Sequence, residues 1–148
     1  MNAPIGAVTL CQDEEGLCAL RFGGNGGRMD ETPLLLQAQR ELEEYFAGRR
    51  SSFSVPLSMH GTPFQLRVWR ALTEIPYGET LSYGELARRI GNPKACRAIG
   101  GANHNNPIMI MIPCHRVIGA NGSMTGYGGG LPVKEYLLEL EQKNCLTV

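Results

Sequence analysis

An unbroken apolar run, residues 108–112, leads directly into Pro113–Val117, which reads Pro-Cys-His-Arg-Val. Continuous apolar residues of this length are typical of a strand buried on both faces, so we predict a core strand over 108–112. The strand would deliver a thiol and an imidazole together. A cysteine attacks as its thiolate and needs a neighbour that takes the proton or stabilises the charge. Cys114 and His115 are therefore the first candidates for chemistry, although a cysteine beside a strand can also be a small buried hydrophobe.

Length and composition indicate a globular protein. The 148 residues suffice for one domain, or for a catalytic domain with a small appendage. No stretch approaches the roughly 18 consecutive apolar residues of a membrane span, and the N-terminus lacks a signal-peptide pattern. The five cysteines are odd in number and form no C-x-x-C pair. These features disfavour a disulfide framework and a zinc knuckle, and they favour a reducing cytoplasm and no membrane.

The net charge of zero conceals an uneven distribution along the chain. Residues 1–59 hold five Lys and Arg against eight Asp and Glu, whereas residues 60–118 hold seven against three. A basic middle segment is compatible with a local footprint for a polyanion. It is equally compatible with ordinary surface charge.

The first third of the chain predicts a small α/β domain over residues 1–58. Residues 6–12 and 17–22 alternate weakly around a turn cluster, which indicates a β-hairpin. Thr32 and Pro33 then mark the start of a helix that ends at Gly48. A short strand is expected over 53–57. This domain shows no chemistry of its own.

The remainder, residues 59–148, predicts a mostly helical domain, so the fold class is α+β. Capping-box patterns open helices at Thr62 and at Ser82. A further helix, from about Lys94 to Ala102, follows Asn92 and Pro93. The two short helices after Ser82 form a helix-turn-helix outline, which occurs both in DNA-binding proteins and in ordinary helical domains.

The second helix of this pair has an unusual composition, with Gly100 and Gly101 adjacent. Each glycine costs a helix about 1 kcal/mol relative to alanine. Such a helix needs its backbone close to something, either another helix or a nucleic-acid groove. In the second case Arg97 is its one long probe, able to fill the space of an extruded nucleotide.

The last helix begins at Pro132 and is expected to bury the side on which Val133, Tyr136, Leu137 and Leu140 lie. Glu141 falls on the same side, where an unpartnered carboxylate is costly to bury. An edge position that reaches solvent would avoid this cost. With a Cys-His pair in need of an orienting group, Glu141 is the best candidate for the third member of a relay.

Taken together, these motifs resemble the methylated-DNA–protein-cysteine methyltransferases, also known as O6-alkylguanine-DNA alkyltransferases. The resemblance extends from about Thr62 to Glu141, and residues 1–57 match only loosely, as a short version of the variable N-terminal domain. Its most specific part is Pro113–Val117. Four further segments and a glycine-rich stretch support it: 77–80, 82–84, 97–100, 105–107 and 129–131.

The resemblance implies a catalytic set. Cys114 would be the acceptor nucleophile, and His115 would take its proton through a bridging water. Glu141 would orient His115, and Asn106 would brace the turn beside the site. Tyr83 would rotate a phosphate and donate to the flipped base as the alkyl group leaves.

The resemblance also implies a DNA surface and a base pocket. The helix-turn-helix would work from the minor groove of double-stranded DNA, with Arg97 in the place of the flipped base. Other DNA-contacting residues would be Tyr83, Ala98, Gly100, Gly101, Ala102 and Arg116. The pocket would be lined by Tyr127, Gly128, Val117 and Met124, with Tyr127 packed on the guanine.

The implied reaction is an in-line displacement at the alkyl carbon, which needs no metal or organic cofactor. A thioether is very stable, so each molecule, expected to be a monomer, should act once. Two departures from the pattern matter. The glycine-rich loop has Gly128 where some relatives have a base-binding serine, and residues 1–59 lack the histidine of a structural zinc site. Whether alkylthymine is also repaired stays open.

Three other functions compete. A non-catalytic lesion-binding relative would carry tryptophan where Cys114 stands. A Cys-His hydrolase would need an oxyanion hole and would turn over repeatedly. A transcription regulator would need long polar side chains on the second helix, which are scarce there.

Overall fold

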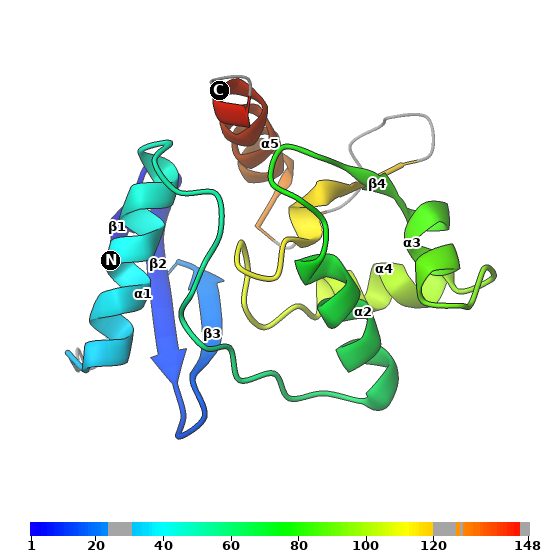
Figure 1. Cartoon of the computed structure of the whole chain (residues 1–148), viewed down its shortest axis with the longest axis horizontal. Helices are drawn as coiled ribbons and strands as arrows, with labels where there is room; N and C mark the ends of the chain where they lie inside the picture. Colours follow the sequence, from blue (N-terminus) through cyan, green and yellow to red (C-terminus); the bar gives the residue numbers. More distant parts are fainter. Residues whose placement is uncertain (24–30, 120–126, 128, 146–148) are drawn as a thin grey trace. The chain divides into compact units, whose positions relative to one another are not determined.

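The computed structural model describes residues 1–23, 31–119, 127 and 129–145 (Figure 1). The chain divides into two compact units. The first comprises Met1–His60 with Pro107–Met109, and the second comprises Gly61–Asn106 with Ile110–Val148. The α+β fold class predicted from the sequence is confirmed. None of the helices in the described ranges is long and apolar enough to cross a membrane.

The first unit is built on a three-stranded antiparallel sheet in the order β1-β2-β3, with β1 at Asn2–Ala3, β2 at Gly6–Gln12 and β3 at Leu17–Phe22. The predicted hairpin is confirmed. Its turn is closed by Asp13, whose Oδ1 accepts hydrogen bonds from the amides of Glu15 and Gly16. This local bonding is typical of an aspartate at the start of a turn.

Helix α1 (Pro33–Phe46) belongs to the first unit and starts as predicted, with Thr32 Oγ1 accepting from the amide of Leu35 at 3.1 Å. Its Glu41 is buried and accepts hydrogen bonds from the amides of Ser54 and Val55. Because these two backbone donors go to a carboxylate, they do not pair with a neighbouring strand. The predicted strand over 53–57 is wrong, and only a single bridge from Leu57 to Leu17 is formed.

The apolar run before the Cys-His pair is buried but is not a strand. Ile108 forms one bridge with Leu20, and the amide of Met109 donates to the Leu20 carbonyl at 3.1 Å. Ile110 then adopts a left-handed backbone with φ of 71° and turns the chain. The predicted strand over 108–112 is therefore wrong, because an apolar run of this kind reports burial rather than extension.

The second unit contains three helices that precede the Cys-His pair: α2 (Pro63–Thr73), α3 (Tyr83–Arg89) and α4 (Cys96–His104). The capping boxes predicted at Thr62 and Ser82 both form. Trp69 of α2 donates from Nε1 to the carbonyl of Ala102 at 3.0 Å, which fixes α4 against α2. Helix α4 begins two residues later than predicted, because Asn92–Ala95 form a turn in which the Ala95 amide bonds the Asn92 carbonyl.

After α4 the second unit continues through a one-turn helix, η1 (Cys114–Arg116), and a short strand, β5 (Val117–Ile118). Strand β5 pairs in parallel with β4 (Leu81–Ser82). The last helix, α5 (Leu131–Cys145), buries Lys134, Leu137 and Glu141. The buried side of α5 therefore agrees only in part with the prediction. Leu137 and Glu141 are buried as predicted, but Val133 and Leu140 are half-buried, and Tyr136 is 36% exposed.

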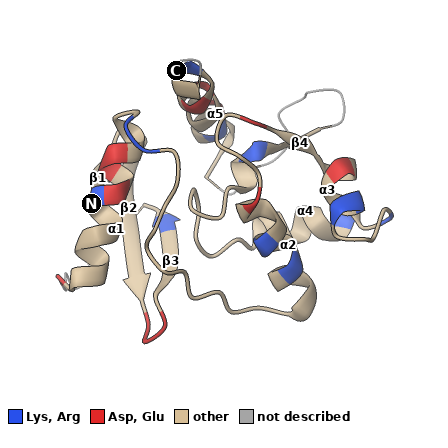
Figure 2. Ribbon diagram, viewed as in Figure 1, with Lys and Arg blue, Asp and Glu red and all other residues tan. Residues whose placement is uncertain are grey.

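Charge differs between the units when each is taken by itself (Figure 2). In the first unit acidic residues mark α1 and the β2–β3 turn. In the second unit basic residues, all of them exposed, mark α2, α3 and the turn that leads into α4: Arg67, Arg70, Arg88, Arg89 and Lys94. The helix-turn-helix outline therefore carries the basic surface expected of a polyanion-binding element.

Candidate active site

Cys114 lies at the start of η1 with only 3% of its surface exposed. Asn106, just after α4, donates from Nδ2 to the Ile112 carbonyl at 2.8 Å and to Cys114 Sγ at 3.2 Å. Burial raises the pKa of Cys114 to about 11, against the opposing effects of the Asn106 hydrogen bond and the charge of Lys134. The resting thiol is therefore protonated at neutral pH, and attack requires a base that removes its proton.

His115 is fully buried next to Cys114, and its Nε2 lies 2.7 Å from Glu141 Oε2. Burial opposes ionisation of Glu141, but its hydrogen bonds and charge pairing with His115 and Arg116 hold its pKa at about 2. An ionised carboxylate can only accept, so we assign the proton to His115 Nε2. Burial also lowers the pKa of His115, which favours the neutral ring. Nδ1 is then a proton acceptor, and it has no hydrogen-bond partner among the described residues.

Arg116 is buried against Glu141, although the sequence predicted that it contacts DNA. Its Nε donates to Oε1 at 2.8 Å and its Nη2 to Oε2 at 3.0 Å, while Nη1 bonds the Ile75 carbonyl at 2.6 Å. The guanidinium also lies over the Tyr77 ring, 5.8 Å from its centroid. A carboxylate buried at the position of Glu141 needs a bound cation, and Arg116 supplies it. The contact of Arg116 with DNA stays a prediction.

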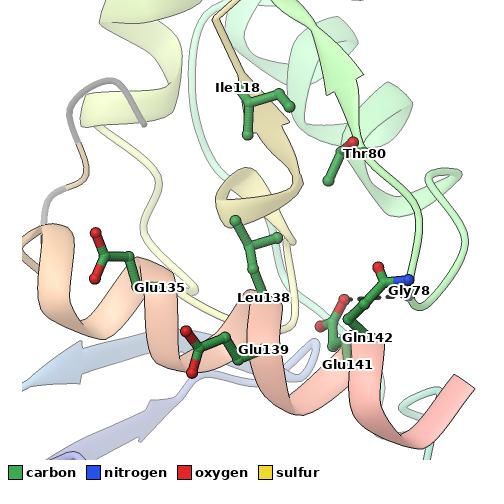
Figure 3. A pocket seen from close by; sticks show the side chains of 8 residues that line it. All are labelled: Gly78, Thr80, Ile118, Glu135, Leu138, Glu139, Glu141 and Gln142. Atoms are coloured by element: carbon green, nitrogen blue, oxygen red, sulfur yellow. Dashed lines mark hydrogen bonds between the residues drawn. The ribbon is translucent and has the colours of Figure 1, made fainter. Parts of the chain in front are cut away.

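Glu141 also accepts a hydrogen bond from the amide of Gly78 at 3.3 Å, and it lines a cavity of about 550 Å³ (Figure 3). Apart from Glu141, none of the predicted site residues that the structure describes lines this cavity. Its other lining residues come from α5 and from the segments before β4 and in β5: Gly78, Thr80, Ile118, Glu135, Leu138, Glu139 and Gln142. The carboxylate is thus held from three directions, by His115, Arg116 and the backbone at Gly78.

Lys134 is a functional candidate that sequence reasoning missed. Its side chain is fully buried, and Nζ donates to the Val117 carbonyl at 2.7 Å. Burial lowers the pKa of Lys134, and the neighbouring Cys114 opposes that shift. Lys134, Leu137 and Glu141 share one side of α5 at helical spacing, a signal that would have placed Lys134 next to the predicted Glu141. Val117, predicted to line the pocket, is also buried here.

Tyr127 lies close to the reacting groups. Burial, with the nearby Cys114 and Glu141, raises its pKa well above the usual value. Its hydroxyl is buried. Met124 and Gly128, also predicted for the pocket, lie outside the described residues.

The residues predicted to contact DNA differ in their exposure to solvent. Arg97, Ala98 and Gly101 are exposed on α4, and Gly100 is half-buried. A Cβ placed on either glycine meets no described atom within 4 Å, so the glycines do not serve close packing against the described part of the chain. Ala102, by contrast, is 3% exposed, and its carbonyl accepts a hydrogen bond from Trp69 Nε1. Tyr83 begins α3, next to the Ser82 cap.

Comparison with known proteins identifies the class. Residues 63–143 match the DNA-binding domain of 6-O-methylguanine DNA methyltransferase, and residues 1–59 match the ribonuclease-like domain of the same family. The chain belongs to the 6-O-methylguanine DNA methyltransferase family, which confirms the resemblance inferred from its motifs.

Relatives cover nearly the whole chain. The methylated-DNA–protein-cysteine methyltransferase of Methanosarcina acetivorans is 54% identical, over 95% of this chain and 94% of its own. The constitutive enzyme of Bacillus subtilis is also 54% identical, over 95% and 92%. The crystal structure of Mycobacterium tuberculosis OGT in complex with DNA has a TM-score of 0.89 at 49% identity, over 97% and 91%.

Proposed function

We propose that this protein repairs alkylated DNA directly, by moving an alkyl group from O6 of guanine in duplex DNA to Cys114. The observation that carries the proposal is the buried chain of contacts from Glu141 to His115, next to a cysteine that Asn106 holds. Membership of the family and the relatives' names support the same reaction. Residues 59–148 would form the catalytic, DNA-binding domain, and residues 1–58 the N-terminal domain.

The proton of Cys114 moves first in this mechanism. His115 Nδ1, the acceptor assigned above, takes it through a bridging water, and the ionised Glu141 stabilises the resulting imidazolium. The thiolate then attacks the alkyl carbon. A carbon–sulfur bond forms while the carbon–oxygen bond breaks, and the electron pair stays on guanine. Tyr83 donates to the leaving base, which needs a proton or a hydrogen bond.

The target base must leave the duplex before it can reach a thiol that is 3% exposed. Helix α4 enters the minor groove with its Gly100–Gly101 backbone, and Arg97 takes the place of the flipped base. Tyr127 packs on the base in the pocket. Recognition of phosphates and groove shape, rather than base edges, suits a repair protein that acts at any sequence.

Each molecule acts once, because the thioether formed on Cys114 is very stable and no described residue beside it offers a route to cleave it. We propose that it acts as a monomer in the cytoplasm without a cofactor. The five cysteines are free, which suits a reducing compartment.

Analysis of the DNA product tests the proposal. A duplex with one O6-methylguanine is incubated with limiting protein, and its bases are quantified after digestion. We expect unmodified guanine to appear in a 1:1 ratio to protein and Cys114→Ser to produce none. Tight lesion binding without base restoration would favour a damage sensor, and repeated hydrolysis of ester or peptide substrates would favour a Cys-His hydrolase.

A further inference from the structure

Arg67 is an exposed residue of α2, and its charge alone would assign it to the phosphates of a bound duplex. Its guanidinium is nevertheless bonded within the protein, because Nη2 donates to the carbonyl of Ile90 at 2.6 Å. The two residues are 23 positions apart in the chain. Arg67 therefore connects α2 to a distant segment of the second unit.

The segment that Arg67 reaches is the end of α3, where the turn of the helix-turn-helix begins. Gly91 takes a left-handed backbone there, with φ of 77°, and its amide bonds the Arg88 carbonyl at 3.1 Å. A glycine in this conformation is a common way to end a helix and to satisfy its last carbonyls. The Ile90 carbonyl lies outside that pattern and accepts from Arg67 instead. A cation at this place also complements the negative end of the helix dipole.

Helix α2 holds the other helix of the pair as well. Trp69 Nε1 donates to the Ala102 carbonyl at 3.0 Å, in the second half of α4. Arg67 and Trp69 are two positions apart, so their side chains leave α2 in different directions. One hydrogen bond from α2 thus reaches the end of α3 and another reaches α4, and the turn over residues 91–95 lies between these two points.

The start of α4 depends on that turn. Helices α2 and α3 both begin with capping boxes, whereas Ala95, the N-cap of α4, makes no side-chain cap hydrogen bond. Arg97 lies in the first turn of α4, two residues after this cap, and is exposed. The position of Arg97 is therefore set by the backbone that precedes it, and Arg67 fixes the beginning of that backbone.

We propose that Arg67 is a positioning residue for DNA recognition: through the Ile90 carbonyl it fixes the turn that places Arg97 for entry into the duplex, and it does not itself contact a phosphate. The inference rests on the proposed function and deepens it. Loss of Arg67 should weaken duplex binding without changing the number of phosphates that the protein neutralises.

The salt dependence of binding tests this distinction. Each neutralised phosphate contributes about 0.9 to the slope of log K against log salt concentration. Affinity for undamaged duplex is measured from about 50 to 200 mM salt. We expect Arg67→Met to bind about fivefold more weakly at every salt concentration, the cost of one lost hydrogen bond, with its slope unchanged. Lys94→Met, an exposed change in the turn itself, is the calibrating variant and should reduce the slope by about one.

Amide hydrogen exchange without DNA supplies a second readout, one that a phosphate contact would not move. Arg67→Met should speed exchange of the Gly91 and Asn92 amides, which close the end of α3, by about fivefold. The Glu85 amide, bonded to Ser82 Oγ at the start of α3, should not change, which separates loosening of the turn from unfolding of the helix. Arg70→Met removes the same charge from the same helix and should leave both exchange rates unaltered.

Three results would overturn the inference. A slope reduced by about one in Arg67→Met would make the residue a phosphate contact, whatever the exchange rates show. Unaltered duplex affinity, or unaltered exchange at Gly91 and Asn92, would show that the Ile90 contact does not position the turn. None of these measurements involves alkyl transfer. Failure of the unaltered protein to restore guanine in the lesion duplex would instead reject the proposed function.

Discussion

Arg116 and Glu141 are joined by two hydrogen bonds, 2.8 and 3.0 Å long, inside the second unit. Paired bonds between a guanidinium and a carboxylate fix both distance and plane. The same carboxylate bonds His115. Arg116, which follows His115 in the sequence, therefore fixes the orientation of Glu141. Glu141 in turn orients the imidazole of His115.

Glu141→Gln keeps the shape of the side chain but removes its charge. We expect single-turnover methyl transfer to fall by about 10²–10³-fold, because the amide cannot stabilise an imidazolium. Glu139→Gln, an exposed change on the same helix, should leave the rate unchanged. A loss of thermal stability without loss of rate would show that Glu141 is structural only.

Arg116→Met should act through Glu141 rather than through DNA. Removing the cation leaves a buried carboxylate unpaired, so we expect the free energy of unfolding to fall by about 3–5 kcal/mol. Affinity for undamaged duplex, measured below the melting temperature, should stay unchanged.

Arg97→Ala is the contrasting variant. It should keep the stability of the protein and lower the rate on duplex DNA more than on free alkylated base. The reverse pattern would return Arg116 to the DNA surface and reject Arg97 as the residue that displaces the base.

Gly101→Gln separates folding from DNA binding. A Cβ at this exposed helical position has no described neighbour within 4 Å, so the new side chain should raise the free energy of unfolding by up to about 1 kcal/mol. The same side chain should block close approach to the groove and weaken duplex binding by about tenfold or more. Reaction with free O6-methylguanine serves as the control and should not change. Unaltered duplex affinity would contradict the assignment of this backbone to the groove.

The free energy of unfolding should fall in acid, in part because the Glu141 carboxylate becomes protonated. The pKa of Glu141 is lowered from 4.5 to about 2 in the folded state, so the unfolded chain binds the proton first as pH falls. Its stabilising contribution is complete above about pH 5 and is lost progressively as the pH falls toward 2. Denaturant titrations at several pH values should show a shallower acid dependence in Glu141→Gln than in the unaltered protein. Identical slopes would mean that the ion pair is already present in the unfolded chain.

Local signals in the sequence predicted elements of both units. The capping boxes at Thr62 and Ser82 depend on residues three apart, and both form with the expected partners. The hairpin around Asp13 is equally local. These elements are determined by short-range hydrogen bonds that a sequence displays directly.

Tertiary partners account for what the sequence did not predict. The apolar run 108–112 is buried as expected, but the left-handed Ile110 breaks it, and no periodicity reveals this turn. Arg116 follows the Cys-His pair and could equally have faced solvent. Its pairing with Glu141, like the burial of Lys134 against the Val117 carbonyl, arises only when α5 packs beside η1.

On the proposed function, Cys114 accepts the alkyl group once and permanently. The most direct measurement is the intact mass of the protein after incubation with a duplex containing one O6-methylguanine, followed by mapping of the modified peptide. We predict a gain of one methylene on Cys114 that saturates at one per molecule, with the other four cysteines unmodified. An unmodified Cys114 in a protein that has bound the lesion, or a methyl group on another residue, would show that Cys114 is not the acceptor.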